Sequence, residues 1–520
     1  MPLQIQATLF SNRSAAFLKI GSNQSAKLDA EQALQFTPND KKAQFRLASA
    51  LFHLGSYRNA LNVLRPMQST DNEEIQTLLR HVIVCEEENR TGVYDIPKIE
   101  AEARQNSRLF HANYCSSAIE LRASGIGGLG GRGIFAKAVI PQGTLLVASK
   151  AIACGFEDEL ESPETSRMLN IMHNRGQAVS KVGLANNLYT SLVGGCCRAI
   201  LNLEGGIGGG LNIDLQRDDV YDEKEEVPKF TLNSLEDLVR RNCFGVKKPV
   251  PEGWSYGTAV YHVPSFFNHS CMPNTVHYHI GDMIFVISGT AIPKGSEVFL
   301  AYYHFLQGES VQDRNTKLQA REGGFSCDCP LCRFEIENAS IVDPAAKLAK
   351  RLAKKNSEAP KWIESGTAGR ELEDAHRYLF KQFNVPIPEY DSSKVPIFDT
   401  KSPAQFSSAK LLLHILCMLQ SSLRQRRAYA DSIPYITEIH ALIKDNLHFS
   451  AVEPLTCPNY ATTVWSHHHR TSHPKVATLW LEELKCICSL VGGNKFYEGK
   501  FQSPVQDEIV RYPCKENTDE

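Results

Sequence analysis

Four cysteines carry the clearest chemical signal in this sequence. Cys327, Cys329 and Cys332 stand in one short segment, FSCDCPLC, and Cys271 lies about 56 residues upstream. A CxCxxC spacing supplies three thiolates from a single loop, and tetrahedral zinc needs one more soft ligand, for which Cys271 is the candidate. Such a site would be closed and structural, and it would fix the chain from Phe325 onward against the segment around Cys271. The alternative is that these cysteines are buried thiols or turn residues.

Two further segments could form one site with the cysteines. NHSCMPN, from Asn268 to Asn274, contains Cys271, and the alternating run 297–303 ends in two adjacent tyrosines, Tyr302 and Tyr303. Neighbouring side chains of a strand point to opposite faces, so we expect the two tyrosines to face different sides. Without the flanking motifs, Tyr302 would be read as a packed strand aromatic.

The order of these motifs resembles a known family. A glycine-rich turn with GRG, then NHSCxPN, then an acidic residue leading into a strand that ends in tyrosine, then FxCxCxxC, is similar to the SET-domain protein lysine methyltransferases. Within them it most resembles the SET and MYND group and fungal tetratricopeptide/SET proteins. The resemblance covers roughly residues 125–333. It does not extend to the MYND zinc finger, because Cys154 has no CxxC partners.

The resemblance implies an activity and its site residues. The methyl donor would be S-adenosyl-L-methionine, the acceptor a lysine amine of a histone or non-histone protein, and the metal a structural Zn²⁺. Tyr302 would lie at the methyl-transfer point, with Tyr303 as the neighbouring candidate. The cofactor would be contacted by Gly131, Arg132, Gly133, Asn242, Asn268, His269, Tyr302 and Phe325, and Tyr261 could wall the lysine channel. The alternative function is a catalytically silent SET-fold scaffold or adaptor.

Two other patterns do not predict a site. Gly128, Gly130 and Gly133 satisfy GxGxxG, but a dinucleotide-binding turn needs a helix directly after it. Residues 134–140 are rich in strand formers and lead into a Pro-x-Gly turn instead. The run His467–His469, with His473, has no recognisable ligand spacing, so we expect surface histidines there.

The N-terminal segment repeats with a period of 34 residues. Small residues recur at this spacing, namely Ser14 with Ala48, Gly21 with Gly55 and Ala26 with Ala60. This is the tetratricopeptide period, in which each repeat is a pair of helices. Asn12, Lys42 and Arg46 also have the spacing of a carboxylate clamp, similar to those of chaperone-binding adaptors. Such a clamp would hold the C-terminal tail of a chaperone.

Hydrophobic periodicity along the chain predicts helices, then strands, then helices, and so a multidomain α+β protein. Residues 1–110 are predicted to form tetratricopeptide-like helical repeats and residues 336–520 a C-terminal helical domain. For the β-rich residues 120–335, the resemblance implies a SET domain with a zinc-binding post-SET segment and an insertion near 154–235. The predicted strands are 134–140, 144–149, 283–288 and 297–303, and the predicted helices are 75–89, 345–355, 370–383, 404–427 and 475–491.

Composition excludes several classes of protein. The 520 residues include 56 Lys and Arg against 58 Asp and Glu, so no basic footprint predicts strong direct nucleic-acid binding. No apolar run approaches the roughly 18 residues of a membrane span, since even 411–419 is interrupted by His414. The first residues lack the pattern of a secretory signal, so we expect the protein in the cytoplasm, the nucleus or both. In that reducing setting the 15 cysteines are thiols or metal ligands.

Overall fold

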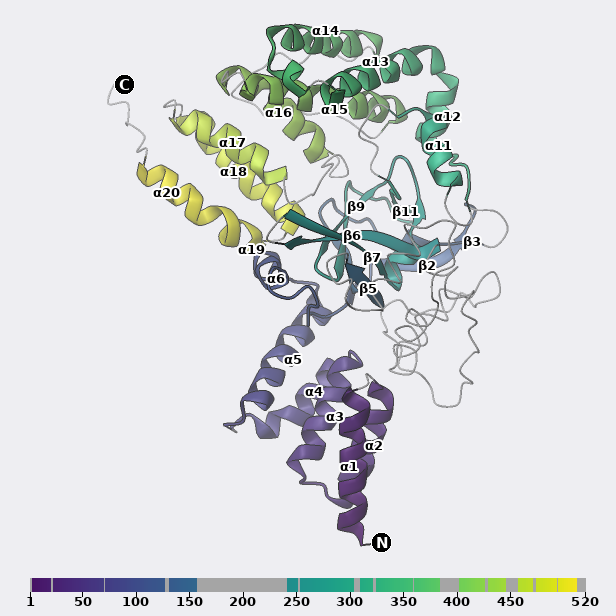
Figure 1. Cartoon of the computed structure of the whole chain (residues 1–520), viewed down its shortest axis with the longest axis vertical. Helices are drawn as coiled ribbons and strands as arrows, with labels where there is room; N and C mark the ends of the chain where they lie inside the picture. The colour runs from purple at the N-terminus through teal and green to yellow at the C-terminus, as the bar shows by residue number, and fades with distance from the viewer. Residues whose placement is uncertain are drawn as a thin grey trace.

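The computed structural model describes the chain in stretches. These are residues 2–19, 22–69, 71–126, 131–156, 241–250, 253–303, 309–320, 324–358, 360–383, 402–425, 429–445, 457–470, 474–492 and 494–511. Most of the predicted insertion lies outside them, as do Gly21, Gly128, Gly130 and His473. Within them, helices lie at both ends of the sequence and the strands lie in between (Figure 1). The mixed fold with N- and C-terminal helical regions is therefore as predicted.

The N-terminal helices stack in sequence order. They are α1 (Leu3–Lys19), α2 (Asn23–Phe36), α3 (Lys41–His53), α4 (Tyr57–Leu64), α5 (Glu73–Thr91) and α6 (Ile96–Ala103). The helices α2 and α4 begin 34 residues apart, and Ala26 and Ala60 are fully buried at matching places, where a larger side chain would separate the helices. Gly55, with φ of 73°, follows α3 in the left-handed conformation that glycine adopts freely. These helices have the predicted period, and their assignment as tetratricopeptide repeats stays a prediction.

Three sheets form the middle of the protein. The first has the order β1 (Tyr114–Cys115), β4 (Leu145–Lys150), β10 (Met283–Ser288), β9 (Thr275–Ile280). The second is β2 (Ile119–Ser124), β3 (Gly131–Ala136), β11 (Glu297–Leu300), β8 (Asn268–His269). The third is β5 (Ala153–Phe156), β7 (Gly253–Val260), β6 (Cys243–Val250). The pairing of β8 with β11 is parallel, and it places Asn268 beside Phe299 and His269 beside Leu300.

The predicted strands agree with the structure except at one end. The strand β10 has the predicted bounds, and β3 and β4 differ from prediction by a few residues. The strand β11, however, ends at Leu300, so the two tyrosines lie just beyond it and not within it. The ladder stops there because β8, the neighbour of β11 at this end, is only two residues long.

The C-terminal region is helical. Its elements are α11 (Val311–Gln319), α12 (Pro330–Glu337), α13 (Ala339–Glu358), α14 (Gly366–Gln382), α15 (Pro403–Gln425), α16 (Tyr429–Asp445), α17 (Cys457–Arg470), α18 (Pro474–Gly492), α19 (Asn494–Tyr497) and α20 (Ser503–Arg511). The helices predicted at 345–355, 370–383, 404–427 and 475–491 correspond to α13, α14, α15 and α18. The pattern did not predict α16 or α17. The helix α17 carries His467–His469, and His468 and His469 are buried in it, so the expectation of surface histidines was wrong for these two.

One helix corrects the expectation about long apolar segments. The helix α15 contains a 21-residue stretch, Pro403–Leu423, that is long and apolar enough to cross a membrane by length and composition, although His414 interrupts it. In the structure 78% of its most apolar window is buried inside the protein. The stretch therefore packs as the central helix of the C-terminal region.

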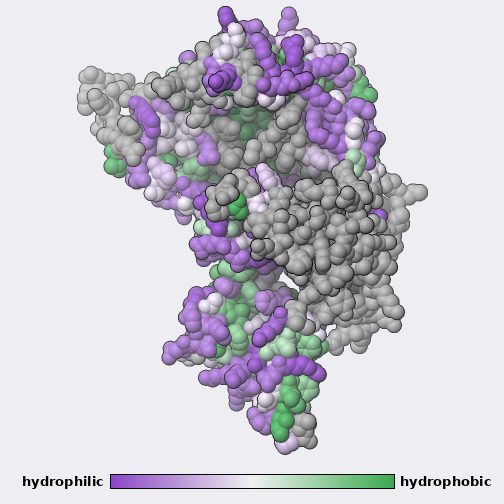
Figure 2. All heavy atoms as spheres, in the orientation of Figure 1, coloured by the Kyte–Doolittle hydropathy of each residue, from purple (hydrophilic) through white to green (hydrophobic). Residues whose placement is uncertain are grey.

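The surface view separates two kinds of helical surface. The helices at the upper end of Figure 2 expose mainly hydrophilic side chains, whereas hydrophobic atoms gather at the N-terminal end. There α1 exposes Leu3, Ile5 and Leu9. The C-terminal helices also contact the sheets directly, because Gly143, in the turn before β4, lies against Leu490 of α18 with φ of 79°.

Candidate metal centre and active site

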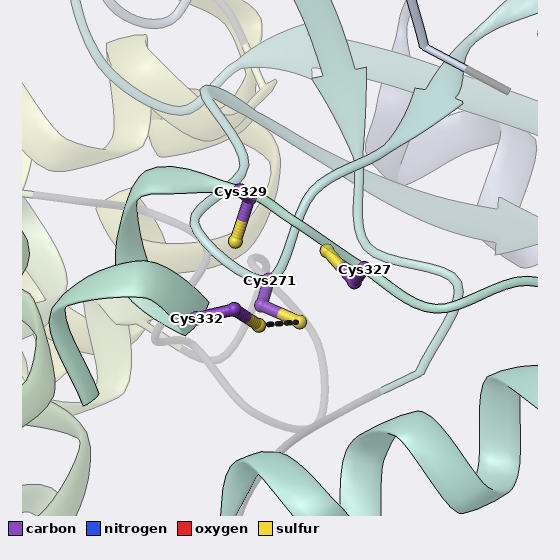
Figure 3. A group of neighbouring side chains, drawn as sticks. All are labelled: Cys271, Cys327, Cys329 and Cys332. Atoms are coloured by element: carbon purple, nitrogen blue, oxygen red, sulfur yellow. Dashed lines mark hydrogen bonds between the residues drawn. The ribbon is translucent and has the colours of Figure 1, made fainter. Parts of the chain in front are cut away.

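The four predicted cysteines converge on one point. The Sγ atoms of Cys271, Cys327, Cys329 and Cys332 all lie within 4.8 Å of one another, and the sulfurs of Cys332 and Cys271 are 3.6 Å apart (Figure 3). A tetrahedral ion with metal–sulfur bonds of about 2.3 Å requires sulfur–sulfur distances of about 3.8 Å. The donor set and its size therefore fit a tetrahedral ion such as zinc. No other cluster of this kind occurs in the described stretches of the chain.

Three separate elements hold these sulfurs in place. Cys271 follows β8, where the N–H of Ser270 donates to the carbonyl of Leu300 on β11 (3.0 Å). The N–H of Cys327 donates to the Asn315 side chain of α11 (2.8 Å). Cys329 is the N-cap of α12, and Pro330 begins that helix with the backbone angle that suits its first position. The chain between β11 and α12 must turn back for these contacts to form, and the CxCxxC loop closes that turn.

Without a metal, the pKa values of the four thiols are shifted in different directions. Hydrogen bonds from the other three cysteines lower the pKa of the Cys329 thiol far below its usual value. The same mutual hydrogen bonds, with burial, raise the pKa of the Cys271 thiol. A cluster that already favours one thiolate is suited to bind a cation, which displaces the remaining protons.

A buried arginine compensates the charge of this cluster. Arg314 of α11 is fully buried, and its Nη2 lies 3.5 Å from the sulfur of Cys332 and 2.6 Å from Oε2 of Glu335. Burial lowers the pKa of Arg314, but the charges of Glu335 and the cysteines outweigh it and hold that pKa above its usual range. The arginine is therefore charged beside the cluster.

His269 links the cysteines to Tyr302. The backbone N–H of Tyr302 donates to Nδ1 of His269 (3.1 Å), so Nδ1 is an acceptor and the neutral ring carries its proton on Nε2. That Nε2 lies 3.3 Å from the sulfur of Cys271 and donates to it. The imidazole ring of His269 thus bridges a proposed metal ligand, Cys271, and the backbone of Tyr302, just after β11. Such outer hydrogen bonds orient metal ligands in known sites.

Aromatic rings surround Tyr302. The ring centroids of His269 and Phe325 lie 5.2 Å and 6.3 Å from that of Tyr302, and those of His269 and Phe325 are 5.9 Å apart. The Tyr302 hydroxyl donates to the carbonyl of Phe267 (2.9 Å). This group joins residues from β8, the end of β11 and the cysteine loop.

Tyr303 lies elsewhere. Its hydroxyl donates to the carbonyl of Lys317 on α11 (3.1 Å), so it is occupied with helix packing. Of the two adjacent tyrosines, the geometry therefore favours Tyr302 as the one near the proposed transfer point.

The glycine turn and NHSC meet around a carboxylate. The side-chain amide of Asn268 donates to Oε1 of Glu297 (2.7 Å) and to the carbonyl of Arg132 (2.8 Å). Oε2 of Glu297 accepts from the hydroxyl of Ser124 (3.0 Å). A Cβ placed on Gly133 would lie 2.1 Å from Oε1 of Glu297, so any larger residue would force this carboxylate to move. Gly131, at the start of β3, is also crowded by the carbonyl of Ile126 at 2.5 Å.

Asn242 and Tyr261 lie around the third sheet. Asn242 directly precedes β6, whose first residue, Cys243, pairs with Val260 of β7. The ring of Phe244 contacts Tyr261 with centroids 5.5 Å apart. Tyr261 is fully buried, its hydroxyl has no hydrogen-bond partner among the described residues, and burial raises its pKa well above the usual value. The roles proposed for Asn242 and Tyr261 stay predictions.

The residues of the predicted clamp lie on two neighbouring helices. Nη1 of Arg46 on α3 donates to Oδ1 of Asn12 on α1 over 3.5 Å, and it also contacts the hydroxyl of Ser11. Lys42 is exposed one turn before Arg46. The structure thus brings Asn12 and Arg46 together, and the ligand of this surface stays a prediction.

Sequence reasoning missed two residues of the site. Glu297 was seen only as the acidic residue that leads into β11, and its distance from NHSC in the sequence hid its bond to Asn268. Arg314 lies on a mainly polar helix, where charged residues are usually exposed. Only its spacing of four from Leu318, which is also buried, signals an inward face.

The fold and these motifs define a SET domain. Residues 131–303 match the family model described as "SET domain". This range begins at Gly131 in the glycine turn, covers NHSC and ends just after β11, and the cysteine loop follows after α11.

Several similar proteins are named as methyltransferases. A protein described as "Methyltransferase" from Gibberella zeae is 27% identical over 356 residues, which cover 64% of this chain and 47% of that protein. Human "N-lysine methyltransferase SMYD2" is 29% identical over 109 residues, covering 20% of this chain and 24% of that protein. Residues 131–303 are therefore similar to a SET domain, and parts of the chain are similar to the SMYD group. The chain spans less than half the length of these relatives.

A different relative matches a shorter part of the chain. The "Small glutamine-rich tetratricopeptide repeat-containing protein 2" of Mycosarcoma maydis is 50% identical over 52 residues, which make up 10% of this chain and 15% of that protein. The matched stretch is too short to define a domain.

Proposed function

We propose that this protein is an S-adenosyl-L-methionine-dependent protein-lysine N-methyltransferase. The observation that carries the proposal is the arrangement at the end of β11, where Tyr302 stands between His269 and Phe325, next to the cysteine cluster. Relatives named as lysine methyltransferases share the SET domain, which supports the same class of reaction here.

Methyl transfer to a lysine amine needs no dedicated general base, but it needs the amine and the methyl group to be aligned. The attacking group is a neutral lysine amine, yet an ordinary lysine has a pKa of about 10.4 and is neutral in only about one molecule in 2,500 at pH 7. A cationic sulfonium beside the ammonium, in an apolar channel, lowers that pKa by charge repulsion and desolvation. Bound cofactor would supply the methyl group. The rings of Tyr302 and Phe325 would then exclude water and align the amine.

The other predicted residues would bind the cofactor. The turn of Gly131, Arg132 and Gly133 allows backbone approach because it has no Cβ at either end. Asn268 is held by Glu297, so its backbone is fixed beside that turn. The side chain of His269 is engaged by Cys271 and Tyr302, which leaves its backbone as the part that would contact cofactor. Asn242 and Phe325 complete the proposed set.

The metal in this proposal is a structural Zn²⁺ held by Cys271, Cys327, Cys329 and Cys332. Four thiolates fill a tetrahedral shell, so the ion has no open position for substrate. The ion would hold the cysteine loop against the end of β8. It would thereby fix Phe325, at the start of that loop, near His269, the last residue of β8. We also propose the cytoplasm or nucleus as the site of action, since a reducing compartment keeps four thiols available.

Two measurements test the activity. Calorimetry with S-adenosyl-L-methionine should give a saturable isotherm, and cell extract treated with labelled cofactor should acquire methyl groups that mass spectrometry maps to lysines. No heat of binding at hundreds of micromolar cofactor would refute the enzyme and favour the scaffold. Labelling confined to residues other than lysine would support methyltransferase activity but exclude lysine as its target.

A second proposal concerns the partner of the N-terminal helices. The contact between Asn12 and Arg46, with Lys42 exposed nearby, supports binding of a peptide C-terminal carboxylate, such as a chaperone tail. Fluorescence anisotropy should show binding of an acidic peptide with a free C-terminus and much weaker binding of its amidated form. Equal affinity for the two peptides would exclude a clamp.

A further inference from the structure

A chain of buried charges leads from the cysteine cluster into the C-terminal helices. Arg314 contacts Cys332 and Glu335, as described above. The other carboxylate oxygen of Glu335 accepts from Nζ of Lys410 (2.8 Å) and from the hydroxyl of Ser407 (2.8 Å), both on α15. All of these side chains are nearly inaccessible to solvent, with 0% exposure for Arg314, 1% for Glu335 and 4% for Lys410.

One short helix joins the two ends of this chain. The helix α12 carries Cys332 in its first turn and Glu335 three residues later, so both point from the same side of the helix. Cys332 reaches the cluster while Glu335 reaches α15. Any change in the position of Cys332 therefore moves Glu335 relative to Lys410.

The charges around this helix depend on whether a metal is bound. A divalent ion held by four thiolates forms a cluster with a net charge of −2. The dianion then faces Arg314. Without the ion, Arg314 loses this charged partner, and Cys332 loses the bond that fixes the first turn of α12. Movement of α12 would take Glu335 away from Lys410, and separating these buried partners is strongly unfavourable, so α15 would loosen as well.

We propose that metal binding at the four cysteines stabilises the packing of the C-terminal helices, through Arg314, Glu335 and Lys410. The metal would act on α15, which crosses the centre of the C-terminal region, in addition to closing the cysteine loop. Arg314 is a positioning residue in this scheme and does not contact substrate. The proposal stands apart from methyl transfer, because it concerns the metal centre and packing alone.

Hydrogen exchange on the unmodified protein gives the first test. Peptides covering α15 should exchange at least fivefold faster after chelation than with zinc bound, while peptides of α1 and α2 keep their rates. The reference peptides come from the far end of the molecule in Figure 1. Equal protection of α15 in the two states, or a wild-type protein that binds no zinc, overturns the proposal.

Variants of the buried charges distinguish two effects of the metal, namely its link to α15 through Arg314, Glu335 and Lys410 and its closure of the cysteine loop. Arg314→Met should weaken zinc binding at least tenfold in competition with a chromophoric chelator. Lys410→Met should change zinc affinity by less than about threefold but speed exchange of α15 in the zinc-bound protein. The matched control is Lys350→Met, which removes a lysine paired with Asp313 at the surface (2.5 Å) and should change neither quantity. Wild-type zinc affinity in Arg314→Met, or unchanged α15 exchange in Lys410→Met, contradicts the link.

Discussion

At the scale of single residues, the site separates two tyrosines that the sequence leaves equivalent. Tyr302 and Tyr303 are adjacent, but the first contacts His269 and Phe325 and the second bonds to α11. We expect Tyr302→Phe to lower methyl transfer about 100-fold, because a positioned hydroxyl at a reacting centre is typically worth that much. Cofactor affinity, measured by calorimetry, should change by less than about threefold, since the ring remains.

Tyr303→Phe is the matched control for this prediction. It removes the same hydroxyl one residue away, and turnover should stay within about twofold of wild type. If the two variants lose activity equally, the assignment of Tyr302 alone is wrong. If neither loses activity, a tyrosine hydroxyl has no part in transfer.

Gly133 gives a second prediction at this scale. Gly133→Ala would place a Cβ 2.1 Å from Oε1 of Glu297 and 2.8 Å from Nδ2 of Asn268, so the two side chains joined by this hydrogen bond must shift. We expect cofactor affinity to fall at least tenfold by calorimetry. Gly245→Ala on β6 meets no atom within 4 Å and should bind cofactor like the wild type. Unchanged affinity in Gly133→Ala would show that this turn does not shape a cofactor site.

At the scale of elements, the cysteine loop determines how α12 follows the sheets. Cys271 comes from the end of β8 and the other three from the start of α12, so no local pairing of strands or helices explains their meeting. Cys329→Ser should reduce bound zinc from one ion per chain to nearly none, since structural zinc contributes on the order of 10 kcal/mol of binding energy. Elemental analysis of the purified variant measures this directly.

An exposed cysteine supplies the control. Cys486 lies at the surface of α18, away from the cluster, and Cys486→Ser should retain one zinc ion per chain. Full occupancy in Cys329→Ser would refute the ligand assignment. Loss of zinc from both variants would point to general misfolding, which circular dichroism would reveal.

At the scale of the whole molecule, a buried histidine ties the N-terminal helices to the segment that leads into the sheets. His111 precedes β1, and its two ring nitrogens bond to Glu88 of α5 (2.6 Å) and Glu102 of α6 (2.8 Å). Burial lowers the pKa of His111, but the hydrogen bonds and charges of the two glutamates outweigh it and raise that pKa above its usual 6.5. The histidine is therefore held in its charged form by folding.

The raised pKa makes stability depend on pH in a defined direction. The contribution of His111 is fully present below pH 6.5, the pKa of the unfolded chain, and is lost as pH rises through the higher folded pKa. His111→Gln should lower the free energy of unfolding by about 3 kcal/mol at pH 6, because it leaves buried carboxylates without their cation. Above the folded pKa the difference from wild type should shrink.

Thermal melts between pH 6 and pH 9 measure this dependence. Glu87→Gln, which affects an exposed ion pair with Arg90, is the control and should shift stability by less than about 1 kcal/mol at every pH. A difference between His111→Gln and wild type that stays constant across this range would show that His111 is not charged in the fold.

Much of the architecture follows from patterns within short segments. The strand β10 has its predicted bounds, and α15 and α18 differ from prediction by a residue or two, because hydrophobic period and turn residues act locally. The end of β11 at Leu300 was not predicted, since a strand stops where its partner stops and β8 is distant in sequence. The helices α16 and α17 were missed because buried helices lose a clear polar face.

The sequence by itself determined the chemistry of the site, namely four soft ligands with CxCxxC spacing, a tyrosine after a strand and an asparagine–histidine pair. Only the tertiary structure decided that Tyr302 rather than Tyr303 lies in the aromatic group, and that Glu297 and Arg314 belong to the site. The physical reason is the distance along the sequence over which each kind of interaction acts. Residue types and spacings act over a few positions, whereas burial and the pairing of distant charges exist only after the chain has packed.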